Sequence, residues 1–68
     1  MKIKIIVNGN IQEFDSDISL SDALKELSLE DKVMAAAVNM EIVKKDCWST
    51  KKLNNGDKLE LLDFVGGG

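Results

Sequence analysis

The single cysteine, Cys47, is the feature that most constrains how this 68-residue chain can fold. One cysteine forms no internal disulfide, and the sequence has no histidine to help build a structural zinc site. A chain of this length lies near the lower limit for a self-supporting core, and domains so short usually depend on such cross-links. The core must therefore come from apolar side chains alone, for which a hydrophobic content of 44% is sufficient.

The net charge of −3 and the absence of histidine argue against several classes of function. Binding of nucleic acid needs a basic face. The one basic patch in the sequence, formed by Lys44, Lys45, Lys51 and Lys52, is predicted to be a solvated turn region rather than an anion site. The chain has no histidine to act as a general base in catalysis, and no glycine-rich phosphate-binding loop precedes a helix. We therefore expect no enzymatic activity, no metal, no cofactor bound by the chain itself and no nucleic-acid partner.

The first residues, Met1-Lys2-Ile3-Lys4, alternate between apolar and polar side chains, unlike the apolar region of a signal peptide. No apolar stretch approaches the length of a membrane span. These patterns predict a cytoplasmic protein that has no membrane partner and is a monomer when free.

The N-terminal part of the sequence predicts a β-hairpin. Residues 2–7 are rich in β-branched side chains, with the apolar residues on one alternating face. Asn8-Gly9-Asn10 then marks a tight turn, because Asn and Gly tolerate positive φ. Residues 11–14 are the expected returning strand.

The clearest local pattern in the sequence is that of an amphipathic helix. Ser19 is placed to cap its first turn, and Asp22 completes a variant of the capping box. The apolar face, with spacing i, i+3, i+4 and i+7, consists of Leu20, Ala23, Leu24 and Leu27. We expect the helix to end at Leu29 or within residues 30–32. One helix of this length cannot bury its apolar face alone, so it must lie on a sheet.

Residues 33–38 form a short, wholly apolar run, which predicts a strand buried on both faces or in the centre of a sheet. Its three alanines leave a helix open as the alternative. The elements expected after it are, in order, a turn at Asn39-Met40, a brief strand over residues 41–44, an irregular segment over residues 45–54 with one helical turn near residues 46–50, a tight turn at Asn55-Gly56-Asp57 and a last strand over residues 58–65.

This order of elements predicts an α+β fold of the ubiquitin-like β-grasp type. In it, one main helix packs on one face of a mixed four- to five-stranded sheet, and the first strand lies beside the last. We expect residues 1–65 to form this domain and residues 66–68 to be a flexible C-terminal glycine tail.

The last strand divides its apolar side chains between two faces. Leu59 and Leu61 point to one face, and Leu62 and Phe64 to the other. If the helix covers the first pair, the second pair lies on the uncovered face, where large apolar side chains often mark a partner site. Alternatively, a curl of the sheet or the segment 45–54 covers the second pair. Both interpretations are open at this point.

The sequence ends in Gly66-Gly67-Gly68, directly after the predicted last strand. Glycines at a terminus sometimes only fray or remain from cloning. Residues without Cβ atoms are, however, suited to threading a narrow active site, and an arm starting at Val65 reaches roughly 10–13 Å. A carboxylate is a poor electrophile and is usually activated as an acyl adenylate made from ATP. Because no other group in the sequence is suited to chemistry, we predict that the Gly68 carboxylate is the reactive group.

At these residues the sequence resembles the ThiS family, the sulfur carriers of bacterial thiamine biosynthesis. The resemblance covers the length, the order of elements, the Asn55-Gly56-Asp57 turn and the Phe64-Val65-Gly66-Gly67-Gly68 ending. The Gly-Gly ending is shared by MoaD-type carriers of molybdopterin synthesis, by carriers for other sulfur metabolites and by ubiquitin-like protein modifiers. The short length favours ThiS over MoaD.

The resemblance implies a reaction cycle carried out by partner enzymes. A ThiF-type, E1-like adenylyltransferase would adenylate the carboxylate of Gly68 using ATP and magnesium. A persulfide from a cysteine desulfurase or sulfurtransferase would replace the AMP and leave a thiocarboxylate. Thiazole synthase would then take the sulfur into the thiazole ring.

The resemblance also assigns roles to individual residues. Gly67 and Gly68 match the terminal pair of the family, whereas Gly66 matches a position at which other small residues are accepted. Gly66 and Gly67 are therefore expected to thread the partner's active site. Leu62 and Phe64, together with Val65, are expected to bind the partners.

Cys47 offers another way to hold sulfur, as a persulfide. Its basic neighbours are only Lys44 and Lys45, and no histidine is present to activate the thiol. Beside Trp48, we expect Cys47 to pack at an edge of the core.

Overall fold

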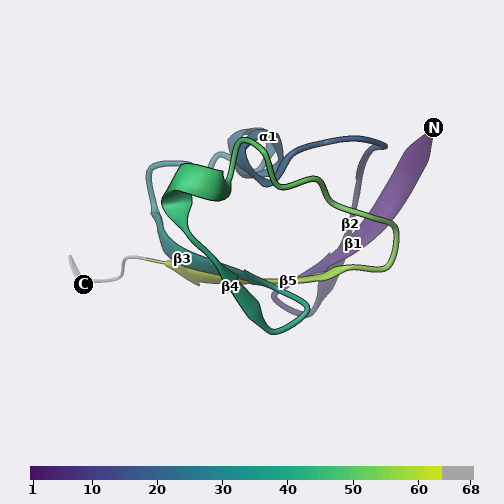
Figure 1. Cartoon of the computed structure of the whole chain (residues 1–68). Coiled ribbons are helices and arrows are strands. Elements are labelled where there is room, and N and C mark those ends of the chain that lie inside the picture. The colour runs from purple at the N-terminus through teal and green to yellow at the C-terminus, as the bar shows by residue number, and fades with distance from the viewer. Residues whose placement is uncertain (64–68) are drawn as a thin grey trace.

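A computed structural model describes residues 1–63, with the side chain of Asp63 left out. Figure 1 shows a helix lying across one face of a sheet, with the other face uncovered. The elements are β1 (Lys2–Val7), β2 (Asn10–Asp15), α1 (Leu20–Glu26), β3 (Val33–Val38), β4 (Glu41–Val43), the 3₁₀ turn η1 (Lys45–Cys47) and β5 (Lys58–Asp63).

The strands form one five-stranded sheet in the order β2-β1-β5-β3-β4. The central strand β5 runs parallel to β1 and antiparallel to β3, so the first and last strands of the described chain lie side by side. This is the predicted β-grasp topology. The expected end of the last strand at residue 65, and the boundary between domain and tail that follows it, lie outside the described residues.

Two hairpins flank the central strand, and both turn where the sequence predicts. Asn8 and Gly9 have φ values of 48° and 89°, the positive values of a type I′ turn. Asn39 and Met40 have φ values of 51° and 72°, although Met40 is not a residue that favours this region. In both hairpins the first turn residue is an asparagine, which tolerates positive φ, and the two-residue turn fixes the register of the strands.

Helix α1 begins as predicted. The Ser19 Oγ accepts a hydrogen bond from the Asp22 backbone N–H at 3.1 Å, which satisfies one of the free donors of the first turn. Leu20, Ala23 and Leu24 face the sheet and are buried. The apolar spacing therefore determined the buried face correctly.

The predicted end of the helix is wrong: α1 stops at Glu26, not near Leu29. Ser28 has a φ of 61°, and its N–H donates to the Lys25 carbonyl at 3.0 Å, while the Leu29 N–H donates to the Leu24 carbonyl at 2.8 Å. These two bonds form a Schellman motif, which usually has glycine at the left-handed position. Because Ser28 occupies that position in place of glycine, the sequence does not show where the helix ends.

Replacing Ser19 with alanine is expected to lower the free energy of unfolding by about 1 kcal/mol, because the cap of α1 is lost. For a domain of this size, that loss lowers the melting temperature by roughly 4–8 °C. The matched control is Ser21→Ala, which places a better helix former inside α1 and is expected to be neutral or stabilising. Equal melting temperatures for S19A and the wild type would show that the cap contributes nothing.

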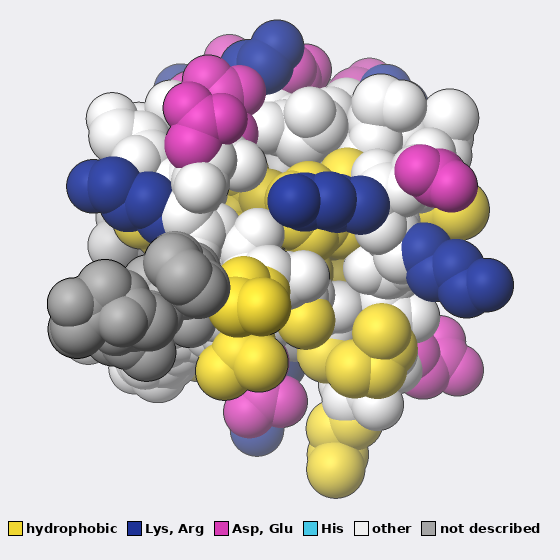
Figure 2. Space-filling view, turned by 90° about the vertical axis from the view of Figure 1, so that its left-hand side faces the viewer, with side chains coloured by type: hydrophobic (Ala, Val, Ile, Leu, Met, Phe, Trp, Pro, Cys, Tyr) yellow, Lys and Arg dark blue, Asp and Glu magenta, His cyan; other side chains and the backbone are white. Residues whose placement is uncertain are grey.

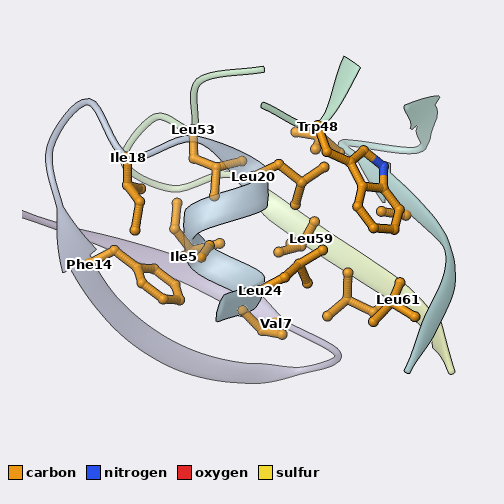
Figure 3. Close-up of a cluster of buried hydrophobic side chains, with 14 residues drawn as sticks. Ile5, Val7, Phe14, Ile18, Leu20, Leu24, Trp48, Leu53, Leu59 and Leu61 are labelled. Atoms are coloured by element: carbon orange, nitrogen blue, oxygen red, sulfur yellow. The ribbon is translucent and has the colours of Figure 1, made fainter. Parts of the chain in front are cut away.

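The core lies between α1 and the inner face of the sheet (Figure 3). Its largest fully buried side chains are Ile5, Leu20, Leu24 and Leu59. The segment after β4 closes the open side with Trp48 and Leu53. The Trp48 indole N–H donates to the Val43 carbonyl at 2.9 Å, so the ring packs without leaving a buried donor unpaired.

Residues 33–38 form a strand, as predicted, and it lies inside the sheet between β5 and β4, but it is not buried on both faces. Val33, Ala36 and Val38 are buried, whereas Met34 is 58% exposed, with an irregularity in the pairing with β5 between Val33 and Ala35. The single helix of the described chain covers one face only, so even inner strands keep one face open to solvent.

Candidate functional site

The carboxyl end of β5 carries Leu62, the one predicted site residue that lies within the described residues. Leu59 and Leu61 point into the core and are 0% and 9% exposed, whereas Leu62 points to the uncovered face and is 62% exposed. The predicted division of faces is therefore correct for these leucines, and neither a curl of the sheet nor the segment 45–54 covers Leu62. The other predicted partner-binding residues, Phe64 and Val65, and the tail glycines, Gly66, Gly67 and Gly68, lie outside the described residues.

Leu62 belongs to a continuous apolar strip across three strands. It pairs directly with Ala35 of β3, and Ala37, two residues further along β3, pairs with Ile42 of β4. Opposed residues of antiparallel strands project on the same face. We call these four residues, Leu62, Ala35, Ala37 and Ile42, the outer apolar patch.

The outer apolar patch combines large and small side chains. Ile42 is 73% exposed on the edge strand β4. The two alanines between it and Leu62 are half-buried, so the small side chains in the middle of the patch project less than the large ones at its ends. Met34 and Met40 are also exposed at its margins, and methionine adapts its shape to different partners. Viewed from the end at which β5 stops, apolar side chains gather in the lower half of the molecule (Figure 2).

The other half of the uncovered face, on β1 and β2, carries an ion pair. Lys2 on β1 and Asp15 on β2 form an ion pair of 2.9 Å. The hydrogen bond between them raises the pKa of Lys2 and lowers the pKa of Asp15 from their ordinary values. Both side chains are well exposed to solvent, where such pairs contribute little to stability. The charged side chains on β1 and β2 share this face with the paired Ile6 and Ile11, of which Ile11 is 67% exposed, so apolar surface is not confined to β5, β3 and β4.

The described residues offer an open apolar surface on the sheet and no enclosed site. Residues 1–63 form no pocket, and no group of three His, Cys, Asp or Glu side chains among them is placed to hold a metal ion. Within the same residues, no buried side-chain polar atom lacks a hydrogen-bond partner.

The sequence predicted Leu62 but missed the rest of the outer apolar patch. In residues 33–38 every position is apolar, so no alternation distinguishes the outward Ala35 and Ala37 from the buried side. Ile42 lies in a strand of three residues, which is too short to show a period. The hairpin turn at Asn39-Met40, which sets the register, was the signal that could have placed Ile42 opposite Ala37.

The prediction that Cys47 packs at an edge of the core is wrong. Trp48 is buried, but Cys47 is exposed. Successive residues of a 3₁₀ turn point about 120° apart, so when Trp48 enters the core its neighbour turns away from it. The ammonium group of Lys45 lies 5.7 Å from the centre of the Trp48 ring, on the solvent side.

The lysines near η1 are engaged in structural contacts, in keeping with a turn region. Besides Lys45, Lys52 donates from its ammonium group to the Asp17 carbonyl at 3.1 Å. The Lys51 carbonyl accepts the Leu20 N–H at 2.8 Å, at the start of α1. These bonds tie the irregular segment to the helix.

The family of the chain follows from comparison with known proteins. A sequence profile of the ThiS family matches residues 5–68. The chain belongs to the ThiS family. This match confirms the family resemblance that the sequence shows.

Two known proteins are similar to this ThiS-family chain, one in structure and one in sequence. The crystal structure of the thiamine biosynthesis protein ThiS from Geobacter metallireducens superposes with a TM-score of 0.79 at 24% identity, over 97% of this chain and 100% of the other, which confirms the fold. A thiazole synthase of Paramagnetospirillum magneticum is 35% identical over 66 residues, or 97% of this chain. The chain spans only 20% of the length of that enzyme.

The part of this ThiS-family chain that the structure describes contains no helix with the length and apolarity needed to cross a bilayer.

Proposed function

We propose that this protein carries sulfur as a thiocarboxylate on Gly68 and delivers it for thiazole formation in thiamine biosynthesis. The observation that carries the proposal is the match to the ThiS family, which extends through the terminal glycines to residue 68. The carrier itself supplies a folded domain that the partner enzymes bind and a reactive end group, and the partner enzymes supply the catalysis.

The arrangement of β5 supports this division of labour. The strand that precedes the glycines is the centre of the sheet, held by β1 on one side and by β3 on the other. The outer apolar patch begins on the same strand at Leu62, so an enzyme that binds the patch has the root of the tail within its reach. The described residues hold no pocket of their own to compete for the end group.

The proposed loading proceeds in three steps at the carboxyl group of Gly68. A carboxylate oxygen attacks the α-phosphorus of ATP on an E1-like adenylyltransferase, and pyrophosphate leaves. The terminal sulfur of a persulfide, formed by a cysteine desulfurase or sulfurtransferase, then attacks the carbonyl carbon, and AMP leaves. A second thiol breaks the remaining S–S bond, which forms a disulfide with the donor sulfur and releases the thiocarboxylate. Magnesium and ATP bind to the adenylyltransferase.

Thiazole synthase is the proposed acceptor of the sulfur. A protein named for that activity contains a region similar to nearly all of this chain, within a protein of about five times its length. We infer that a thiazole synthase uses a carrier of this kind as its sulfur donor. The nucleophilic sulfur of the thiocarboxylate supplies the ring sulfur, and the carboxylate is regenerated for another cycle.

Intact mass spectrometry tests the proposal directly. After incubation with an E1-like adenylyltransferase, Mg-ATP, a cysteine desulfurase and cysteine, the carrier is expected to gain the mass difference between sulfur and oxygen. Omission of ATP should prevent the gain. An isopeptide bond to lysines of other proteins in place of this product would instead indicate a protein modifier, and no gain with any cognate adenylyltransferase would contradict the carrier function.

Replacing Cys47 with serine is expected to leave sulfur loading within about twofold of the wild type. The cysteine is exposed and so is free to react, but the proposed cycle uses only the C-terminal carbonyl. Because the side chain does not pack in the core, C47S should also melt at the wild-type temperature. A carrier that loses its added sulfur mass in the C47S variant would show that the thiol holds the sulfur.

A further inference from the structure

The first residues of the two hairpin turns, Asn8 and Asn39, share a feature that turn formation does not explain. Both have positive φ, at 48° and 51°, where Gly, Asn and Asp are all tolerated. What distinguishes Asn from Gly at these positions is its side-chain amide. In both turns the amide oxygen binds the backbone of β5.

Asn8 holds β5 beyond the point at which β1 ends. The parallel pairing of β1 with β5 reaches only Val7 and Leu59, because the chain then enters the hairpin turn. The Asn8 N–H donates to the Leu59 carbonyl at 3.0 Å, and the Asn8 Oδ1 accepts the Leu61 N–H at 2.8 Å. The side chain thus replaces the next acceptor that β1 would have supplied. The bond is partly buried, so leaving this N–H unpaired is costly.

Asn39 makes the equivalent contacts at the opposite end of β5. Its N–H donates to the Lys58 carbonyl at 2.8 Å, and its Oδ1 accepts the Lys58 N–H at 3.0 Å. It also donates from Nδ2 to the Asp57 carboxylate at 3.0 Å. The two asparagines therefore hold the same strand from opposite sides, Asn39 at its first residue and Asn8 near its last.

We propose that Asn8 is a positioning residue for sulfur loading, which acts by fixing the backbone of β5 at Leu61, two residues before the strand ends at Asp63. Leu62 of the outer apolar patch follows directly, so the same bond sets the direction of the docking side chain. This inference rests on the proposed function, since it concerns how the carboxylate of Gly68 reaches its activating enzyme. Asn39 holds β5 too far from that end to have this effect.

The test compares Asn8→Gly with Asn39→Gly in the full chain. Glycine keeps the positive φ of each turn without strain and removes only the side-chain bonds. Two quantities are measured: amide hydrogen exchange at Leu61 in the free carrier, and the steady-state kinetics of adenylation by the E1-like partner. In N8G we expect exchange at Leu61 to speed up by on the order of tenfold, as for the loss of one hydrogen bond.

The kinetics distinguish positioning from general stability. N8G is expected to lower kcat for adenylation by on the order of tenfold, because the carboxylate then approaches ATP from a wider range of directions. N39G loses two exposed side-chain hydrogen bonds where N8G loses one that is partly buried, so the melting temperatures of both variants are measured as well, and N39G should keep kcat and KM within about twofold. The conservative variant Asn8→Asp retains an acceptor oxygen for the Leu61 N–H and should recover most of the wild-type kcat.

Each outcome separates the two claims. Wild-type carrier that no adenylyltransferase modifies would overturn the proposed function and this inference with it. Wild-type carrier that is modified, with N8G and N39G showing equal kinetics, would overturn the positioning role of Asn8 alone. Unchanged exchange at Leu61 in N8G would show, without any partner, that the side chain does not hold the strand.

Discussion

Deleting Gly68 is expected to abolish sulfur loading while leaving the fold intact. The deletion leaves Gly67 with the terminal carboxylate, withdrawn by one residue, or roughly 3.3–3.6 Å of extended chain. A misplacement of about 1 Å in an active site already costs around 100-fold in rate, so we expect at least this loss in adenylation. The measurement is the rate of AMP transfer, followed by the intact mass of the carrier.

Two controls separate reach from folding and from steric fit. The melting temperature of the deletion variant should equal that of the wild type, because none of the bonds in residues 1–63 depends on Gly68. Gly68→Ala keeps the length of the chain and adds a single methyl group, so it should load better than the deletion variant. A deletion variant that is loaded at the wild-type rate would show that loading does not require Gly68.

Aspartate substitutions at the adjacent residues Leu61 and Leu62 are expected to have opposite consequences. Leu61 is 9% exposed in the core, and a carboxylate there costs several kcal/mol. A domain of this size has a total stability of roughly 3–10 kcal/mol, so L61D should be largely unfolded. Leu62 is 62% exposed, and L62D should keep the wild-type melting temperature to within a few degrees.

The effect of L62D should appear in partner binding. Removing a central apolar contact and adding a charge to the outer apolar patch is expected to weaken the complex with the adenylyltransferase roughly 10- to 100-fold. Titration calorimetry or a binding-rate assay gives this value, and Glu13→Gln, on the edge strand β2 at the far side of the sheet, is the surface control. Wild-type affinity in L62D would mean that the partner binds elsewhere on the carrier.

The sequence was sufficient to predict most of the fold because its local signals agree with one another. Asn8-Gly9 and Asn55-Gly56 mark turns, Ser19 marks a helix start, and the apolar spacing after it marks the face that meets the sheet. Together these signals leave few arrangements for a small sheet and one helix. The assignment of Leu59 and Leu61 to the core then follows from the two-residue period of a strand.

The remaining features depend on contacts that no local pattern records. Ser28 occupies a left-handed position that usually signals itself with glycine, so the helix end was placed too late. The exposure of Cys47 depends on the direction in which its neighbour Trp48 enters the core. Asn8 looks like a turn residue in the sequence, and its bond to Leu61, across 53 positions, is apparent only when the sheet is assembled.

The central place of β5 has a consequence for when the protein can work. A ribosome makes the two hairpins first, but their inner strands, β1 and β3, have no common neighbour until residues 58–63 emerge. The sheet therefore closes only when β5, the last of the described strands, has been synthesised, and the helix completes the burial of its apolar face at that point. A chain that stops early during translation lacks both the closed sheet and the terminal glycines, so an unfinished molecule presents neither the docking surface nor the group to be charged.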